Sequence, residues 1–156
     1  MLKVKIVGKY GQGKFATIDD DFLYLTKYRW YLYNGRYAAR NKYLGNNKTK
    51  VVFMHNEILE KPKNMVIDHI NGNGLDNRLS NIRVCTQSQN MLNINKHKDN
   101  KSGHKGIYFC KNVNKWRAQI TIPNIGNKHI GLFNDLEEAI KAYSKAKAKF
   151  HKEYAR

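Results

Sequence analysis

The sequence of 156 residues has few cysteines and few acidic residues, and it has no long apolar run. Its two cysteines, Cys85 and Cys110, are far apart and belong to no CxxC pair. This excludes a disulfide framework and argues against a structural zinc site. No stretch approaches about eighteen consecutive apolar residues, so we expect no transmembrane helix. The N-terminus interleaves lysines with apolar residues and lacks a signal-peptide core, so we expect a cytoplasmic protein.

Positive charge is what the chain has in excess. Its formal net charge is +17, from 29 Lys and Arg against 12 Asp and Glu. Residues 1–95 carry 15 basic against 7 acidic residues and residues 96–156 carry 14 against 5, so the charge is not confined to a tail. Solubility needs a net charge of only about 2–8 in a small domain, and we therefore expect a nucleic acid as partner. A membrane surface is the next candidate, but no basic amphipathic segment stands outside the expected packed helices.

The first fifty residues predict β-structure. The run "LKVKIV" alternates apolar and charged residues as a half-buried strand does, and "GKYGQGK" at 8–14 is a turn. That turn formally matches GxxxxGK. Phe15, however, stands where a P-loop needs a Mg²⁺-binding Ser or Thr, and we expect no helix after it, so we reject a P-loop. Residues 24–43 mix aromatic and basic side chains, which indicates a sheet with buried aromatics and a possible phosphate-contacting outer face.

The segment 51–95 predicts a short helix, two strands and a second helix. "FMHNEILE" before a proline is typical of a short helix. "MVIDHI" and "NIRVC" predict strands on either side of "NGNGLDN", whose residues tolerate left-handed backbone. Thr86 followed by Gln89 is a capping box, so the second helix should begin near Gln87.

The polar residues of this segment suit a divalent-metal site. Neighbouring strand residues point to opposite sides of the pleat, so Asp68 and His69 cannot both bind one ion with ideal geometry. Asp68 and Asn90 would supply two oxygen ligands, which suits Mg²⁺ or Mn²⁺ and argues against zinc. His69 would act as general base for a water that attacks phosphorus, and Asn81 would hold its imidazole in the correct tautomer. From these residues alone, a turn with no catalytic role stays open.

The stretch "VIDHINGNGLDNRLSNIRVCT", followed by Asn90, resembles the HNH nuclease motif, whose fold is the ββα-metal hairpin and helix. Its lettering is similar to the D-H…N…N variant of homing endonucleases from phages and mobile introns. The resemblance implies that Asp68 and Asn90 are metal ligands, that His69 is the general base and that Asn81 positions this base.

Two further residues are candidates for this site. His55 falls where many relatives have a His before an Arg-Leu pair, which Asn56-Glu57 replaces here, and we assign it a phosphate-contacting or structural role. Arg83 could contact the scissile phosphate, and an exposed strand arginine with no such role is the alternative.

The C-terminal part begins after a polar stretch. Residues 96–104 predict a linker, since no apolar side chain occurs from 95 to 104. Beyond it, "GIYFC", "KWRAQITI" and "KHIGLF" predict three strands, and "DLEEAIKAYSKAKAKFHKEY" predicts a helix capped by Asp135 and Glu138. The face of that helix toward the sheet carries Leu136, Ile140, Tyr143, Lys147, Phe150 and Tyr154. The strand face toward the helix carries Trp116, Ala118, Ile120 and Ile122.

Residues 105–156 resemble the APETALA-type (ethylene-response-factor) DNA-binding domain, which also occurs fused to HNH nucleases. The matching features are Lys105-Gly106-Ile107, Trp116-Arg117-Ala118, Gly131-x-Phe133 and Glu137-Glu138-Ala139. The resemblance implies a three-stranded sheet in the major groove, backed by one helix. Arg117 can take guanine and Gln119 adenine, and Thr121 shares their face. Four flanking residues would meet phosphates: Lys105, Tyr108, Lys111 and His129.

We therefore expect an α+β chain with a β-rich N-terminal segment (1–50), an HNH ββα unit (51–95), a linker (96–104) and a three-stranded antiparallel sheet on one helix (105–156). The expected activity is a homing-type endonuclease that uses Mg²⁺ or Mn²⁺ on double-stranded DNA in a bacterial or phage-infected cell. One motif would nick one strand, in a monomer or weak dimer with no evident protein partner. A DNA-binding regulator with a degenerate nuclease fold and a basic RNA-binding protein are the alternatives.

Overall fold

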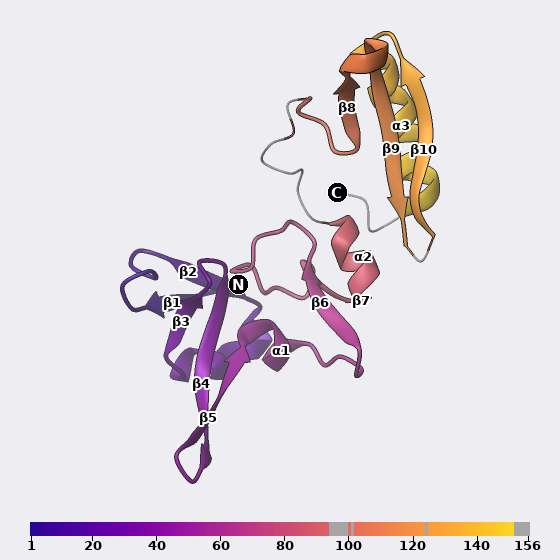
Figure 1. Cartoon of the computed structure of the whole chain (residues 1–156). Helices are drawn as coiled ribbons and strands as arrows, with labels where there is room; N and C mark the ends of the chain where they lie inside the picture. Colours follow the sequence, from indigo (N-terminus) through magenta and orange to yellow (C-terminus); the bar gives the residue numbers. More distant parts are fainter. Residues whose placement is uncertain (94–99, 101, 124, 152–156) are drawn as a thin grey trace. The chain divides into compact units, whose positions relative to one another are not determined.

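The computed structural model describes residues 1–93, 100, 102–123 and 125–151. They form two compact units, Met1–Gln87 and Ser88–Arg156 (Figure 1). Residues 96–99 and 101 of the predicted linker, and Tyr154 of the predicted last helix, lie outside the described residues. None of the helices within the described ranges combines the length and apolarity needed to cross a membrane.

A five-stranded sheet in the order β2-β1-β3-β4-β5 forms the base of the first unit. β1 pairs antiparallel with β2 and parallel with β3, and the other pairs are antiparallel. The predicted β-rich N-terminal segment is confirmed, and a strand rather than a helix follows the turn at 8–14. The strands are β1 (Leu2–Val7), β2 (Phe15–Ile18), β3 (Trp30–Tyr33), β4 (Tyr37–Gly45) and β5 (Lys48–Phe53).

The core of the first unit is centred on the buried side chain of Trp30, whose indole N–H donates to the carbonyl of Leu25 at 2.8 Å. Leu25 lies in a 3-10 helix, η1 (Asp20–Lys27), so the sheet expected from residue 24 onward begins later, at Trp30. The reason is a tertiary contact: burial of Leu25 in this core overrides the strand propensity of the neighbouring aromatics. The cluster consists of Val4, Ile6, Ala16, Ile18, Leu25, Trp30, Leu32, Ala38 and Met54.

The segment with the candidate site follows this sheet. The short helix α1 (Met54–Ile58) leads to a separate two-stranded antiparallel sheet of β6 (Met65–His69) and β7 (Ile82–Thr86). Its register places Asp68 opposite Arg83 and His69 opposite Ile82. The helix α2 (Gln87–Leu92) begins where the capping box predicts. The predicted strand, turn, strand and helix are thus present.

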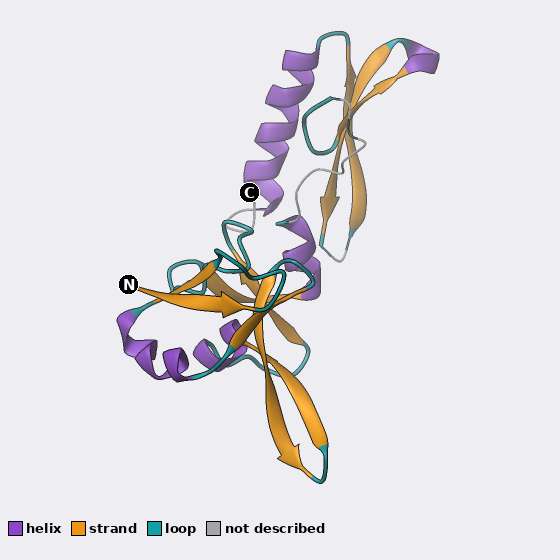
Figure 2. Cartoon of the chain, turned by 90° about the vertical axis from the view of Figure 1, so that its left-hand side faces the viewer, coloured by secondary structure: helices purple, strands orange, loops and turns teal. Residues whose placement is uncertain are grey.

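The second unit contains a three-stranded antiparallel sheet, β10-β9-β8, with α3 along one face (Figure 2). Ala118 and Ile120 on β9 are buried against Tyr143 on α3, as the two-residue and helical periods predict. Ala139, which is not on the predicted helix face, is buried in the same cluster. Asp135 caps α3 by accepting from the N–H of Glu137 at 2.6 Å. The elements are β8 (Ile107–Cys110), η2 (Lys111–Val113), β9 (Lys115–Ile122), β10 (Gly126–Phe133) and α3 (Leu136–His151).

Gly106 provides a test of this packing. Its φ is +74°, and a Cβ at this position would lie 2.4 Å from both the carbonyl oxygen of Gln119 and Cε2 of Tyr143. Gly106→Ala should therefore lower the free energy of unfolding by about 2–4 kcal/mol, because backbone strain adds to a steric clash. Urea denaturation measures the loss. Gly126→Ala, at φ +96° with nothing within 4 Å, is the control for backbone strain alone. Equal losses in the two variants would contradict the packing.

Candidate active site

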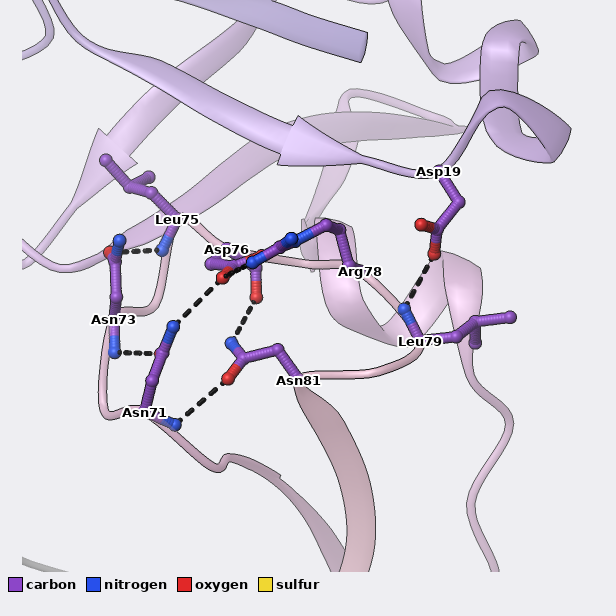
Figure 3. Close-up of polar contacts among 8 residues, drawn as sticks. All are labelled: Asp19, Asn71, Asn73, Leu75, Asp76, Arg78, Leu79 and Asn81. Carbon is purple, nitrogen blue, oxygen red and sulfur yellow. Dashed lines mark hydrogen bonds and ion pairs between the residues drawn. The ribbon is translucent and has the colours of Figure 1, made fainter. Parts of the chain in front are cut away.

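The turn between β6 and β7, residues 70–81, is closed by side chains (Figure 3). Oδ1 of Asn81 accepts from the backbone N–H of Asn71 at 2.9 Å, and its Nδ2 donates to the carbonyl of Asp76 at 2.7 Å. The side chains of Asn71 and Asn73 accept from the backbone N–H groups of Asn73 and Leu75. Asparagine side chains thus serve as hydrogen-bond partners for backbone groups that have no strand partner here.

The same turn is tied to the N-terminal sheet. Thr17 on β2 donates its backbone N–H to the carbonyl of Leu75 at 2.7 Å and accepts from the N–H of Asn77 at 2.8 Å, which makes a short parallel β-bridge. The carboxylate of Asp19 accepts from the N–H of Leu79 at 2.8 Å (Figure 3). Two residues far from the turn in sequence therefore fix its path.

Asp76 is the charged centre of the turn. Arg78 donates from Nε and Nη2 to its two carboxylate oxygens at 2.7 and 2.6 Å, and the side chain of Asn71 donates to Oδ2 at 2.9 Å. The hydrogen bonds from Arg78 hold the pKa of Asp76 below its ordinary value and outweigh the effect of burial, which raises it. Asp76 therefore remains a carboxylate, and thus an acceptor for three donors, across the physiological pH range.

Asp68 forms a buried ion pair across the β6–β7 hairpin. Arg83 donates to its Oδ2 from Nε at 3.1 Å and from Nη2 at 2.9 Å. The two side chains are only 5% and 18% exposed, so Arg83 is not the exposed strand arginine of the alternative interpretation. A buried carboxylate next to a guanidinium avoids the cost of an unpaired charge.

His69 points to the other side of β6, as the strand period predicts. Its Nε2 lies 3.2 Å from Oδ1 of Asn77, and its ring packs against Tyr37 and His55 with centroid separations of 5.7 and 5.2 Å. An amide oxygen can only accept, so Nε2 carries the proton and the neutral ring keeps its lone pair on Nδ1.

The pKa of His69 lies below the ordinary value for histidine. Burial lowers it, the hydrogen bond to Asn77 and the charge of Asp68 raise it, and the charge of Arg36 lowers it further. Burial is the largest of these effects, so the imidazole is neutral near pH 7. A neutral imidazole can accept a proton from water.

His55 on α1 completes this group of rings. It stacks on Phe53 at a centroid separation of 5.4 Å and an interplanar angle of 4°, and it forms T-shaped contacts with Tyr37 and His69. Burial first, and then the neighbouring His69 and Lys61, lower the pKa of His55 to about 3. A ring that is neutral at physiological pH cannot meet a phosphate as a cation. The structure therefore favours the structural role for His55 over the phosphate-contacting one.

The donors on the hairpin fit a hard divalent cation in part. Asp68 offers carboxylate oxygen, the ligand type that Mg²⁺ and Mn²⁺ prefer, and His69 is directed away from it toward Asn77. Within the described ranges, no three His, Cys, Asp or Glu side chains gather into a metal-binding cluster. Asn90, the second predicted ligand, lies on α2 in the second unit, so its pairing with Asp68 stays a prediction.

Comparisons with known proteins address the same segment. A family model described as HNH endonuclease matches residues 60–92, which contain both strands of the hairpin, the turn and α2. Protein 3.8 of Escherichia phage T7 is 34% identical over 95 residues, which cover 61% of this chain and 77% of that protein. The chain therefore contains an HNH endonuclease domain, at residues 60–92.

An uncharacterized HNH endonuclease of Acanthamoeba polyphaga mimivirus is also 34% identical, over 100 residues. The match covers 62% of this chain and half of the mimivirus protein. No solved structure gives a significant match. The matches support the HNH domain, and the structure shows the mixed α+β layout. The APETALA-type domain stays a prediction.

The HNH hairpin brings Asp68, His69 and Arg83 together, but the two asparagines of the turn differ from our expectation. We assigned the contact with the imidazole to Asn81. In the structure Asn77 makes this contact, and both polar atoms of the Asn81 side chain hold the turn. Sequence reasoning missed Asn77, although it directly follows the acidic residue of the turn and is completely buried.

Five of the seven predicted DNA-binding residues of the second unit lie on one sheet, and Lys105 and Lys111 lie outside its strands. Arg117 packs over the ring of Tyr108 at 5.9 Å, the hydroxyl of Tyr108 donates to Gln119 at 3.1 Å, and Gln119 pairs with His129 across β9 and β10. Thr121 is exposed on the same strand. Lys111 is exposed in η2, whereas Lys105 is half-buried and donates from Nζ to the carbonyl of Leu92 at 2.8 Å.

Asp76 provides a stability test of the turn. Asp76→Asn should lower the free energy of unfolding by about 1–2 kcal/mol at pH 7, because it removes the charge from the partly exposed hydrogen bonds to Arg78. The pKa of Asp76 is lower in the folded than in the unfolded chain, so this stability is present above the unfolded pKa of about 4 and is lost as the pH falls through the folded pKa.

Urea denaturation at pH 7 and at pH 3 measures this difference, which should shrink at the lower pH. Asp21→Asn is the matched control, since Asp21 is exposed. A stability of Asp76→Asn equal to that of Asp21→Asn at pH 7 would show that the network does not stabilise the turn.

Proposed function

We propose that this protein is a homing-type endonuclease that hydrolyses phosphodiester bonds of double-stranded DNA, with one nick for each active site. One observation carries the proposal: two adjacent, buried residues on β6 are held in opposite directions by different partners. Arg83 holds Asp68, and Asn77 holds the neutral imidazole of His69. A metal ligand and a general base need this separation, because the base must remain free of the metal.

In the proposed reaction His69 takes the proton of an attacking water. The Nε2–H group donates to Asn77, so the lone pair of Nδ1 accepts the proton as the water oxygen bonds to phosphorus. The phosphorus–oxygen bond to one deoxyribose breaks in the same displacement, and a solvent water protonates the departing sugar oxygen. A divalent cation held by Asp68 and Asn90, Mg²⁺ or Mn²⁺, would supply charge stabilisation to the phosphoryl oxygens. Arg83 orients the carboxylate of Asp68 by donating two hydrogen bonds to one of its oxygens.

The partner in this proposal is duplex DNA, held by electrostatics and selected by the second sheet. The net charge of +17 supplies the attraction to phosphate. Arg117, Gln119 and Thr121 follow one another at two-residue spacing on one face of β9, where they could read base edges. A non-catalytic DNA-binding regulator and an RNA-binding protein are the competing functions.

Loss of the base tests the proposal first. Wild type should nick supercoiled DNA in the presence of Mg²⁺ or Mn²⁺, and His69→Ala should nick about 10²–10⁴-fold more slowly while binding DNA equally well. Gel assays of nicking and fluorescence anisotropy of binding give the two readouts. His104→Ala, which removes an exposed imidazole, is the control. Binding without cleavage by the wild type would support the regulator, and preference for RNA over DNA would support the RNA-binding protein.

Loss of the positioning residue gives a second test. Asn77→Ala should lower kcat for nicking by about 10–100-fold and leave KM within about twofold, because the imidazole loses the partner that fixes its tautomer and direction. Asn77→Asp keeps an acceptor oxygen and should restore part of kcat. Steady-state kinetics, with urea denaturation as the folding control, distinguish these effects. A parallel loss of kcat and folding stability in both variants would mean that Asn77 is only structural.

A further inference from the structure

The outer part of the β4–β5 hairpin is a two-stranded ribbon that projects from the first unit (Figures 1 and 2). We refer to residues 41–51 as the basic ribbon. All of them except Gly45 are exposed, including Tyr43 at 64% and Leu44 at 58%. The buried cluster of the first unit takes none of its members from the basic ribbon. Its shape must therefore have a cause other than core packing.

The basic ribbon has the local structure of a well-formed hairpin. Its strands keep one register from Asn41 opposite Val51 to Tyr43 opposite Thr49, and a register shift lies between Tyr43 and Gly45 next to the tip. At the tip, Asn46 and Asn47 have φ values of 48° and 57°, as a type I′ turn requires. Such a turn matches the twist of the strands, so local chemistry holds the ribbon in place. An exposed two-stranded ribbon is nevertheless only marginally stable in water.

The charge of the basic ribbon lowers its stability further. Lys42 and Lys50 lie directly opposite each other, an arrangement of like charges that destabilises a strand pair. Lys48 shares the face of Lys50, two residues away on β5. Among the residues that the structure describes, none of these three lysines forms an ion pair.

The surrounding sequence does not compensate for this charge. The chain has seven Lys and Arg between Asp21 and Glu57 and no acidic residue in that interval. Glu57, the nearest carboxylate that follows, pairs with Arg40 at 2.6 Å. Lysines that face each other without acidic neighbours suit the binding of a polyanion, because its phosphates supply the missing negative charge.

We propose that the basic ribbon inserts into the major groove of duplex DNA and that its lysines contact the phosphates on the groove walls. Five residues at about 3.3 Å each give the ribbon a reach of about 16 Å. The major groove is about 12 Å wide and 8.5 Å deep and admits a two-stranded β-ribbon. The groove of duplex RNA that corresponds to it is too narrow and deep. The inference rests on the proposed function only in taking DNA as the partner.

A triple substitution tests the inference. Lys42→Gln/Lys48→Gln/Lys50→Gln should weaken binding to a DNA duplex at least tenfold at about 0.1 M salt. The slope of log affinity against log salt should fall by about 2–3 units, since each phosphate contact contributes about 0.9. Lys5→Gln/Lys9→Gln/Lys14→Gln removes the same charge from exposed residues at the β1–β2 end of the sheet and should leave the slope nearly unchanged. Fluorescence anisotropy in EDTA measures binding without cleavage.

Two further measurements keep the test decisive. The ribbon variant should unfold at the same or a higher temperature than wild type, because it loses the Lys42–Lys50 repulsion, so weaker binding cannot be attributed to misfolding. Binding to a duplex RNA of the same sequence should fall equally in both triple variants. Equal DNA affinities and slopes for the two variants would overturn the inference. A ribbon variant that loses RNA and DNA binding to the same extent would also overturn it.

The result is independent of the nuclease proposal. If the wild type binds DNA through the basic ribbon but does not nick it, the endonuclease proposal is contradicted and the ribbon proposal is supported. If the wild type nicks DNA and the ribbon variant binds DNA as tightly as the wild type, the endonuclease proposal is supported and the ribbon proposal is contradicted.

Discussion

The structure around the candidate active site depends on one requirement, that the backbone of the β6–β7 turn finds hydrogen-bond partners outside a strand ladder. Buried peptide groups without partners are costly, and the turn meets the need with its own side chains. Asp76 is at the centre of this arrangement, because its carboxylate and its carbonyl both accept hydrogen bonds from the turn. The position of Asn77, and with it the direction of the His69 ring, follows from this closure.

Strand alternation then separates two kinds of chemistry within one dipeptide. On one side of β6, Asp68 lies in a charged environment, paired with Arg83. On the other side, His69 lies among neutral aromatic rings, where burial keeps it uncharged. A separation of this kind follows from a regular strand with a partner on each side. This is why a short motif can specify it.

Much of this could be predicted from the sequence, because local rules decide it. The two-residue period placed Asp68 and His69 on opposite faces, and the capping boxes located the starts of α2 and α3. The roles of Asn77 and Asn81 could not be predicted, since both residues are asparagines and only the closed turn decides which of them faces the imidazole. The neutral state of His55 depends on rings from β4 and β5, which no local pattern identifies.

The bridge between Thr17 and the turn has a consequence for modularity. The HNH family match spans residues 60–92, but the path of the turn also depends on β2 and on Asp19, and the ring of His69 rests on Tyr37. The matched segment therefore depends on the N-terminal sheet for its structure. Grafting it onto another scaffold would require carrying the N-terminal sheet with it, and recombination between relatives should preserve the sheet and the hairpin as one inherited block.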